Sequence, residues 1–178
     1  MDLATRVMQA AAPSQVAPVS VREGDQAPKF VNCQSNELLA KLISETKSLV
    51  DEISDGNIAI VCPDEMTEEI CRVLDSAKIS FGRAGSSGIE LGLTVVPVSV
   101  VKGLELDGVI VVEPAKIVAA QTHGLRALYV ALTRSTRRLT VLHSQPLPSA
   151  MIASYRGSSP MACVTAWSPP ESMLSAWT

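Results

Sequence analysis

The stretch Asn57-Ile58-Ala59-Ile60-Val61-Cys62 (residues 57–62) is a continuous apolar run, and it decides the fold class. Runs of this kind are typical of strands that are buried on both faces, as in parallel sheets. The stretch GVIVVE at residues 108–113 has the same character. Together the two runs predict a sheet with a covering layer on each side.

Helical patterns alternate with the strands. Ser35 can cap a helix that runs to about Ile53, and Pro63 and Asp64 can open another that runs to about Ala77. The apolar stripe predicted for the first of these helices comprises Leu38, Leu39, Leu42, Ile43, Val50 and Ile53. Further strands are predicted at 29–33, 93–99 and 138–143, and further helices at 2–11 and 126–133. This alternation indicates an α/β fold with a mainly parallel sheet.

Charge and composition limit the function classes. The net charge of −3 argues against a protein that coats nucleic acid through a generally basic surface. Arg126, Arg134, Arg137 and Arg138 lie close together in the sequence. They are either a local basic patch or a solvated helix end.

The cysteines point to no metal or redox site. None of the four has a partner at C-x-x-C spacing, so we expect reduced, mostly buried thiols in a cytoplasmic protein and no bound metal. The sequence also has no apolar run of about 18 residues, the length that a membrane helix needs.

Regular patterning extends over residues 1–145, which we expect to form one domain. The helix predicted at 2–11 begins at the chain start, so we expect the domain to be incomplete at its N-terminus. Prolines and glycine predict a loop at 12–27. Residues 146–178, rich in proline and serine, are predicted to form an irregular or flexible tail.

Two segments carry chemistry. The first is VKGLELDG at residues 101–108, which lies between two predicted strands. Open α/β sheets bind ligands at the carboxyl ends of their strands, and Gly103 would let the backbone approach a phosphate or a ribose there. Glu105 could accept hydrogen bonds from sugar hydroxyls. The alternative is a surface turn with a solvated charge pair.

The second segment is LYVALTRSTRRL at residues 128–139. Arg134 stands near the end of the predicted helix and just before a strand. An arginine held there can be aimed at a phosphate. It can equally interact with the C-terminus of its own helix, and both interpretations stay open.

The two segments resemble motifs V and VI of UvrD/Rep-type superfamily 1 DNA helicases, in the family's order. The resemblance is close over about residues 94–143, and the sequences of both motifs are most similar to those of the HelD-like branch. It implies a RecA-like three-layer fold with a mainly parallel sheet and helices on both faces. Residues 1–145 would then be the second RecA-like domain. Leu106 stands where the family usually has Phe, and Ser99 where many members have His.

The resemblance also implies roles for single residues. In this family two RecA-like domains clamp ATP between them, and the second supplies an arginine finger, here Arg134. Gly103 and Glu105 occupy the positions that approach the nucleotide, with Glu105 at its sugar. Ser99 and Lys102 stand where motif V approaches single-stranded DNA.

The sequence contains no G-x-x-x-x-G-K-[ST] motif. The cofactor implied is ATP with Mg²⁺, held by the first RecA-like domain of the same parent protein, and the isolated chain is expected to be inactive. One alternative is a domain of a HelD-like factor that uses ATP to remodel RNA polymerase, which would then be a partner. Another is a non-catalytic interaction module. A Rossmann-type dinucleotide enzyme is a further alternative, disfavoured because no G-x-G-x-x-G follows a strand.

Overall fold

The computed structural model describes residues 2–12, 27–84 and 92–155. The described strands all run parallel in a six-stranded sheet of order β1-β6-β5-β2-β4-β3. Their bounds are β1 (Lys29–Asn32), β2 (Asn57–Cys62), β3 (Gly82–Arg83), β4 (Gly92–Pro97), β5 (Leu106–Val112) and β6 (Ser135–His143).

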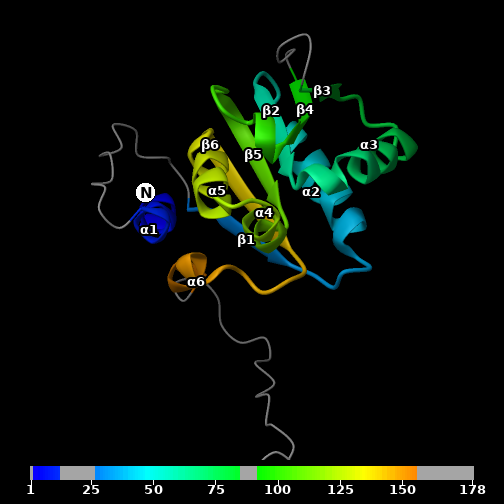
Figure 1. The fold of residues 1–178 in the computed structure, drawn as a ribbon. Coiled ribbons are helices and arrows are strands. Elements are labelled where there is room, and N and C mark those ends of the chain that lie inside the picture. Colours follow the sequence, from blue (N-terminus) through cyan, green and yellow to red (C-terminus); the bar gives the residue numbers. More distant parts are fainter. Residues whose placement is uncertain (1, 13–26, 85–91, 156–178) are drawn as a thin grey trace, which may run out of the picture.

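Helices cover both faces of this sheet (Figure 1). Those on one face are α1 (Asp2–Ala11), the 3-10 turn η2 (Val98–Val100), α4 (Pro114–Ala120), α5 (Gly124–Thr133) and α6 (Ser149–Tyr155). Those on the other are α2 (Leu38–Glu52) and α3 (Thr67–Ser76), the latter preceded by the 3-10 turn η1 (Asp64–Met66). The predicted three-layer α/β fold with helices on both faces is therefore confirmed.

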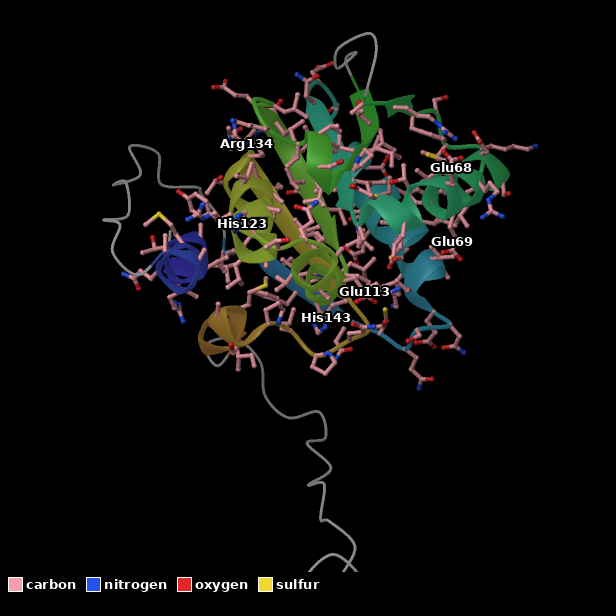
Figure 2. The ribbon with its side chains drawn as sticks, viewed as in Figure 1. Glu68, Glu69, Glu113, His123, Arg134 and His143 are labelled. Atoms are coloured by element: carbon pink, nitrogen blue, oxygen red, sulfur yellow. The ribbon has the colours of Figure 1, made fainter. Side chains whose placement is uncertain are left out.

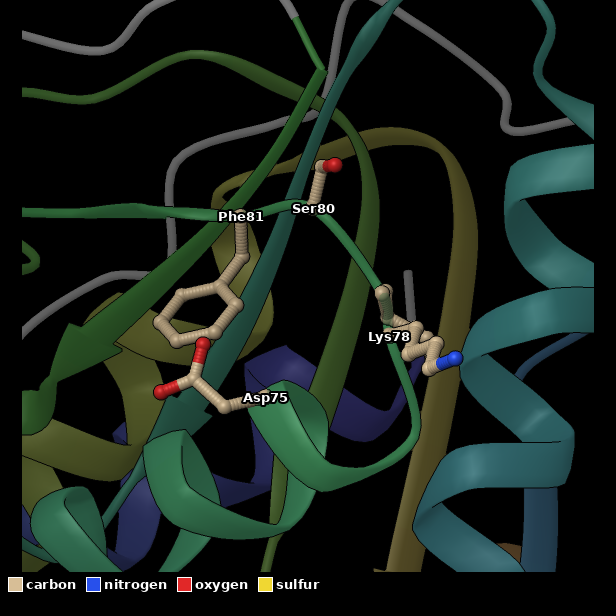
Figure 3. A pocket seen from close by; sticks show the side chains of 5 residues that line it. Asp75, Lys78, Ser80 and Phe81 are labelled. Carbon is tan, nitrogen blue, oxygen red and sulfur yellow. The ribbon is translucent and has the colours of Figure 1, made fainter.

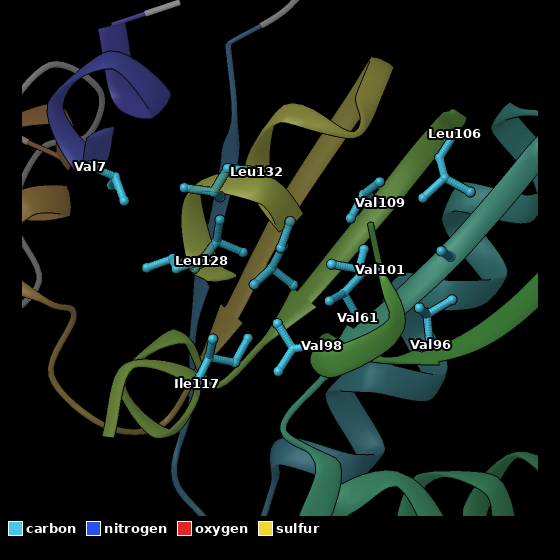
Figure 4. Packing of buried hydrophobic residues seen from close by; sticks show 14 of the residues in the cluster. Val7, Val61, Val96, Val98, Val101, Leu106, Val109, Ile117, Leu128 and Leu132 are labelled. Carbon is cyan, nitrogen blue, oxygen red and sulfur yellow. The ribbon is translucent and has the colours of Figure 1, made fainter. Parts of the chain in front are cut away.

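The central strand β2 shows why its sequence is apolar throughout. Ala59 and Val61 pack into the cluster under α5, whereas Ile58, Ile60 and Cys62 pack into the cluster under α2 and α3. Side chains alternate between the faces of a strand, so a strand with helices on both sides buries every position. Figure 4 shows the cluster on the α5 side, to which Leu128 and Leu132 of α5 belong.

Several element boundaries differ from the sequence-based predictions. Helix α2 begins at Leu38, its N-cap residue Glu37 makes no side-chain cap bond, and Ser35 instead donates to the Ser144 hydroxyl at 3.2 Å. Leu49 is buried in place of Val50, which is 38% exposed. Helix α4, which is absent from the predicted elements, begins at Pro114, because proline suits the first turn of a helix.

The C-terminal segment also differs from its prediction. Residues 146–178 were expected to be irregular, yet α6 lies within them and the side chain of Met151 is fully buried. Helix α6 spans only Ser149–Tyr155, too short to show a clear apolar period in the sequence. Residues 156–178, like most of the loop predicted at 12–27, lie outside the described residues.

Candidate functional site

The two motif segments meet at the amino-terminal edge of the sheet. The Leu106 amide donates to the Arg134 carbonyl at 3.1 Å, and the Thr136 hydroxyl donates to the Leu106 carbonyl at 3.2 Å. These bonds join the start of β5 to the start of β6, ahead of the regular ladder that begins at Gly108. The predicted site residues Gly103, Glu105 and Arg134 are therefore brought to one edge of the molecule.

Arg134 is held at both its backbone and its side chain. It caps the C-terminus of α5, where its amide donates to the Ala131 carbonyl at 3.4 Å. Its Nη1 donates to the Leu104 carbonyl at 3.1 Å. Its Nε is buried and has no hydrogen-bond partner among the described residues. An unpaired buried donor costs about 1–3 kcal/mol, so this conformation is one that a further acceptor would stabilise.

The loop that contacts Arg134 depends on Gly103. This residue adopts a φ of +88°, in the region that L-amino acids rarely enter. No atom lies within 4 Å of the position that a Cβ would take there. Glycine is thus needed at this position for backbone direction rather than for space within the chain. Lys102 and Glu105, on either side of it, are exposed.

Ser99 lies at the opposite edge. It belongs to η2, which directly follows the carboxyl end of β4, and its amide donates to Asp64 Oδ1 at 3.3 Å. The chain then crosses the α5 face, where Val98 and Val101 are buried, before entering β5. The prediction that the Gly103 loop lies at the carboxyl ends of the strands was wrong, because the loop ends at the amino end of β5.

The carboxylate beside Ser99, Asp64, belongs to an acidic segment of the chain. Asp64 and Glu65 lie in η1, and Glu68 and Glu69 lie in the first turn of α3. Glu68 forms an ion pair with Arg83 at 2.7 Å. The Asp64 carboxylate beside Ser99 opposes the approach of a phosphate backbone.

A buried polar cluster at the carboxyl edge was not foreseen. Glu113 is 1% exposed, has a φ of +48°, and accepts hydrogen bonds from the Ser144 amide (2.9 Å), the Ser144 hydroxyl and the Gln145 amide (3.4 Å). His143 lies beside this segment, with Nδ1 2.8 Å from the Gln145 carbonyl. Figure 2 shows Glu113 and His143 at one end of the sheet and Arg134 at the other. The sequence signal that could have indicated this cluster is a glutamate, Glu113, directly after an apolar strand.

The other arginines of the cluster have separate environments. Arg138 forms an ion pair with Glu52 at the end of α2, while Arg126 and Arg137 are exposed. Only Arg134 is fixed against the motif loop, so the four do not act as one patch.

Two hollows lie away from the predicted site. One of 470 Å³ is lined by Asp75, Lys78, Ile79, Ser80 and Phe81 at the end of α3 (Figure 3). The other, of 220 Å³, lies where the end of α1 meets α4 and the start of α5. Neither includes any of the residues proposed from the motifs.

The described cysteines, Cys33, Cys62 and Cys71, are unpaired, and burial raises the pKa of each thiol. Within the described ranges, no three His, Cys, Asp or Glu side chains form a group that could hold a metal ion. Of the helices in those ranges, none is long and apolar enough to cross a membrane.

Comparisons with known proteins agree with the motif resemblance. The family model of the UvrD-like helicase C-terminal domain matches residues 92–142, the segment from β4 to the end of β6. No curated protein matches the chain.

Two solved structures share its fold. The first is the C-terminal domain of a possible DNA helicase from Lactobacillus plantarum WCFS1, with 18% identity and a TM-score of 0.62, covering 85% of this chain and 89% of that one. The second is the Sulfolobus solfataricus SWI2/SNF2 ATPase core in complex with double-stranded DNA. It has 13% identity and a TM-score of 0.52, covering 70% of this chain and 29% of that one. The family match over residues 92–142 and the shared fold make this chain similar to the C-terminal domains of UvrD-like helicases.

Proposed function

We propose that this chain is the C-terminal ATP-binding half-domain of an ATP-dependent DNA helicase or translocase, and that Arg134 is its arginine finger. The observation that carries the proposal is the junction of the two motif segments. It fixes Arg134 against the Gly103–Glu105 loop, inside the segment that matches the helicase family.

The residues at this edge fit a nucleotide. Arginine stays charged and presents a planar fork of donors that matches phosphate oxygens. Nη1 of Arg134 is fixed by the Leu104 carbonyl, so its charge has a defined position. ATP supplies the phosphoryl group, and a guanidinium fixed beside it stabilises its oxygens, an effect of about 10³–10⁵ in rate for such fingers. Glu105, exposed on the same loop, is suited to accept hydrogen bonds from the sugar.

The proposal needs a second domain. The sequence contains no P-loop motif, so we assign the P-loop lysine and the Mg²⁺-binding acid to a first RecA-like domain of the same parent protein. Such a protein would act in the cytoplasm, which stays a prediction.

Ser99 and Lys102 are the proposed contacts to single-stranded DNA. Both are exposed, and Lys102 can bind a phosphate. The Ser99 amide is already bonded to Asp64, and this carboxylate repels a phosphate backbone, so we expect weak and salt-sensitive DNA binding by the chain alone.

The test joins this chain to a P-loop-bearing first domain and measures DNA-stimulated ATP hydrolysis. Arg134→Ala is expected to lower kcat by about a hundredfold or more, because the charge facing the phosphoryl oxygens is lost. Arg137→Ala is the matched control, since Arg137 is exposed, whereas Arg134 is the arginine that bonds to the Leu104 carbonyl. Unchanged turnover in the folded Arg134 variant would favour the non-catalytic interaction module instead.

The HelD-like alternative, with RNA polymerase as partner, gains no support from the comparisons. Neither the matched family description nor the two similar structures refers to RNA polymerase.

A further inference from the structure

The direction of the Arg134 side chain depends on one carbonyl. The Arg134 backbone is fixed by its bonds to Ala131 and Leu106, which leaves the side-chain torsions to decide where the guanidinium points. Among the described residues, the Leu104 carbonyl is the acceptor that the guanidinium uses. Whatever sets the orientation of this carbonyl therefore sets the orientation of Arg134.

The turn at residues 102–103 sets that orientation. Gly103 immediately precedes Leu104, and its φ of +88° gives the chain a direction that an alanine would resist. The space around its missing Cβ is open to beyond 4 Å, so crowding within the chain does not explain the glycine. Sequence reasoning offered another role, in which Gly103 lets the loop approach a nucleotide closely. The two roles predict different effects of substitution.

We propose that Gly103 is a positioning residue for Arg134: its left-handed turn aims the Leu104 carbonyl at Nη1 and so orients the guanidinium. Because Glu105 is the next residue along the same loop, a ligand that moves Glu105 also moves the acceptor that holds Arg134. The link to phosphoryl transfer rests on the proposed function, but the link between Gly103 and Arg134 does not.

The buried Nε of Arg134 provides a direct probe. Its proton is shielded from solvent and has no hydrogen-bond partner among the described residues, so its NMR signal reports the local packing. The Nε–Hε signal of Arg134 in the ¹⁵N-labelled full chain is assigned by its disappearance in Arg134→Lys. Its chemical shift and its exchange rate with water are then measured in each variant.

In Gly103→Ala the Arg134 signal should shift, and its exchange with water should become about tenfold faster or more, because the side chain loses its acceptor and opens locally. In Gly103→Asn the signal should stay close to that of the native chain, because asparagine tolerates a positive φ in turns. Gly92→Ala is the matched control. Gly92 has a φ of +118° and an equally open Cβ position, but it lies at the start of β4, which β2 and β5 separate from β6.

Two results would overturn the proposal. The first is an unchanged Arg134 signal in folded Gly103→Ala. The second is a Gly103→Asn chain that perturbs the signal as strongly as Gly103→Ala, since the backbone conformation would then not be the cause. Should Gly103→Ala fail to fold, Gly103→Asn decides alone: it must fold and keep the native signal.

A kinetic arm separates this proposal from the proposed function. In the chain joined to a P-loop-bearing domain, a positioning role predicts that Gly103→Ala lowers kcat while KM for ATP stays within about threefold. A rise in KM with native kcat would instead mean that Gly103 meets the nucleotide itself, and would refute the positioning role. If the NMR coupling holds but Arg134→Ala leaves turnover unchanged, the positioning stands and the arginine-finger function fails.

Discussion

The thiol of Cys62 shows what full burial does to a single ionisable residue. It ends β2 beneath α3, and its Sγ lies 3.6 Å from the Thr67 hydroxyl. Burial raises the pKa of this thiol to about 11 from the ordinary value of 9.0, and the Thr67 contact offsets only part of the effect. The folded state therefore keeps the thiol neutral over a range in which the unfolded state ionises it.

This raised pKa predicts a loss of stability at alkaline pH. The contribution of the neutral thiol is fully present below the unfolded value of 9.0 and is lost as pH rises toward about 11. The urea midpoint of the native chain should fall across this window more steeply than that of Cys62→Ala, which has no thiol to ionise. Parallel decreases in the two chains would show that other groups cause the loss.

The sequence identified some residues of the candidate site, but it did not predict their place in the sheet. Arg134 and Gly103 stand in motifs whose residue types are specific, and the structure brings them together at one loop. The sequence placed them at the carboxyl ends of the strands, whereas they lie at the amino ends. Strand order and the path of residues 98–105 are long-range properties that local patterns do not encode. Glu113 was missed for a related reason: its partners Ser144 and Gln145 lie far along the chain.

Helix α5 ends at the residue before Arg134. Its first residue, Gly124, allows α5 to approach α4 closely. A Cβ on Gly124 would lie 2.1 Å from the Val118 carbonyl oxygen and 2.5 Å from its Cα, both backbone atoms of α4. Backbone cannot move aside as a flexible side chain can. Gly124 is therefore required by the close approach of α4 and α5.

We predict that Gly124→Ala destabilises the chain by about 3 kcal/mol, the upper end of the usual cost of overpacking. Gly82→Ala is the control, because its nearest neighbour, the Thr94 hydroxyl, would be at an ordinary 3.6 Å. Its unfolding free energy should change by less than about 1 kcal/mol. Urea unfolding of both variants tests this, and equal losses would show that the α4–α5 contact tolerates a methyl group.

Elements with long apolar patterns were predicted well, and short ones were not. The strands β2 and β5 and the helices α1, α2 and α5 have enough residues for a period to appear. Helices α4 and α6 have seven residues each; α4 begins at Pro114, and α6 directly follows Pro148. In such short segments the period is ambiguous, and tertiary packing decides the conformation.

At the scale of the whole molecule, the face that carries α5 is completed from both ends of the described chain. Leu3 and Val7 of α1 and Met151 of α6 join the same buried cluster as Leu128 of α5. Figure 1 shows α1 next to α5, and α6 next to α1. The sequences of α1 and α6 did not predict this contact, because the pattern of a helix does not show which element it packs against.

This arrangement predicts that α6 is part of the folded domain. Met151 is fully buried, so Met151→Ala should lower the free energy of unfolding by about 2–5 kcal/mol through lost contacts and the cavity left behind. Ile152, the next residue, is 46% exposed, and Ile152→Ala should cost less than about 1 kcal/mol. Urea unfolding followed by far-ultraviolet circular dichroism measures both.

The comparison of these two variants decides where the domain ends. If only Met151→Ala lowers the free energy of unfolding strongly, α6 unfolds together with the sheet. Helices α1 and α6 then both stabilise the cluster to which α5 belongs. If both variants lower the free energy of unfolding by a small and equal amount, α6 does not contribute to the stability of the domain. The domain would then end with β6 and the segment that Glu113 binds, and α1 alone would cover that side of α5.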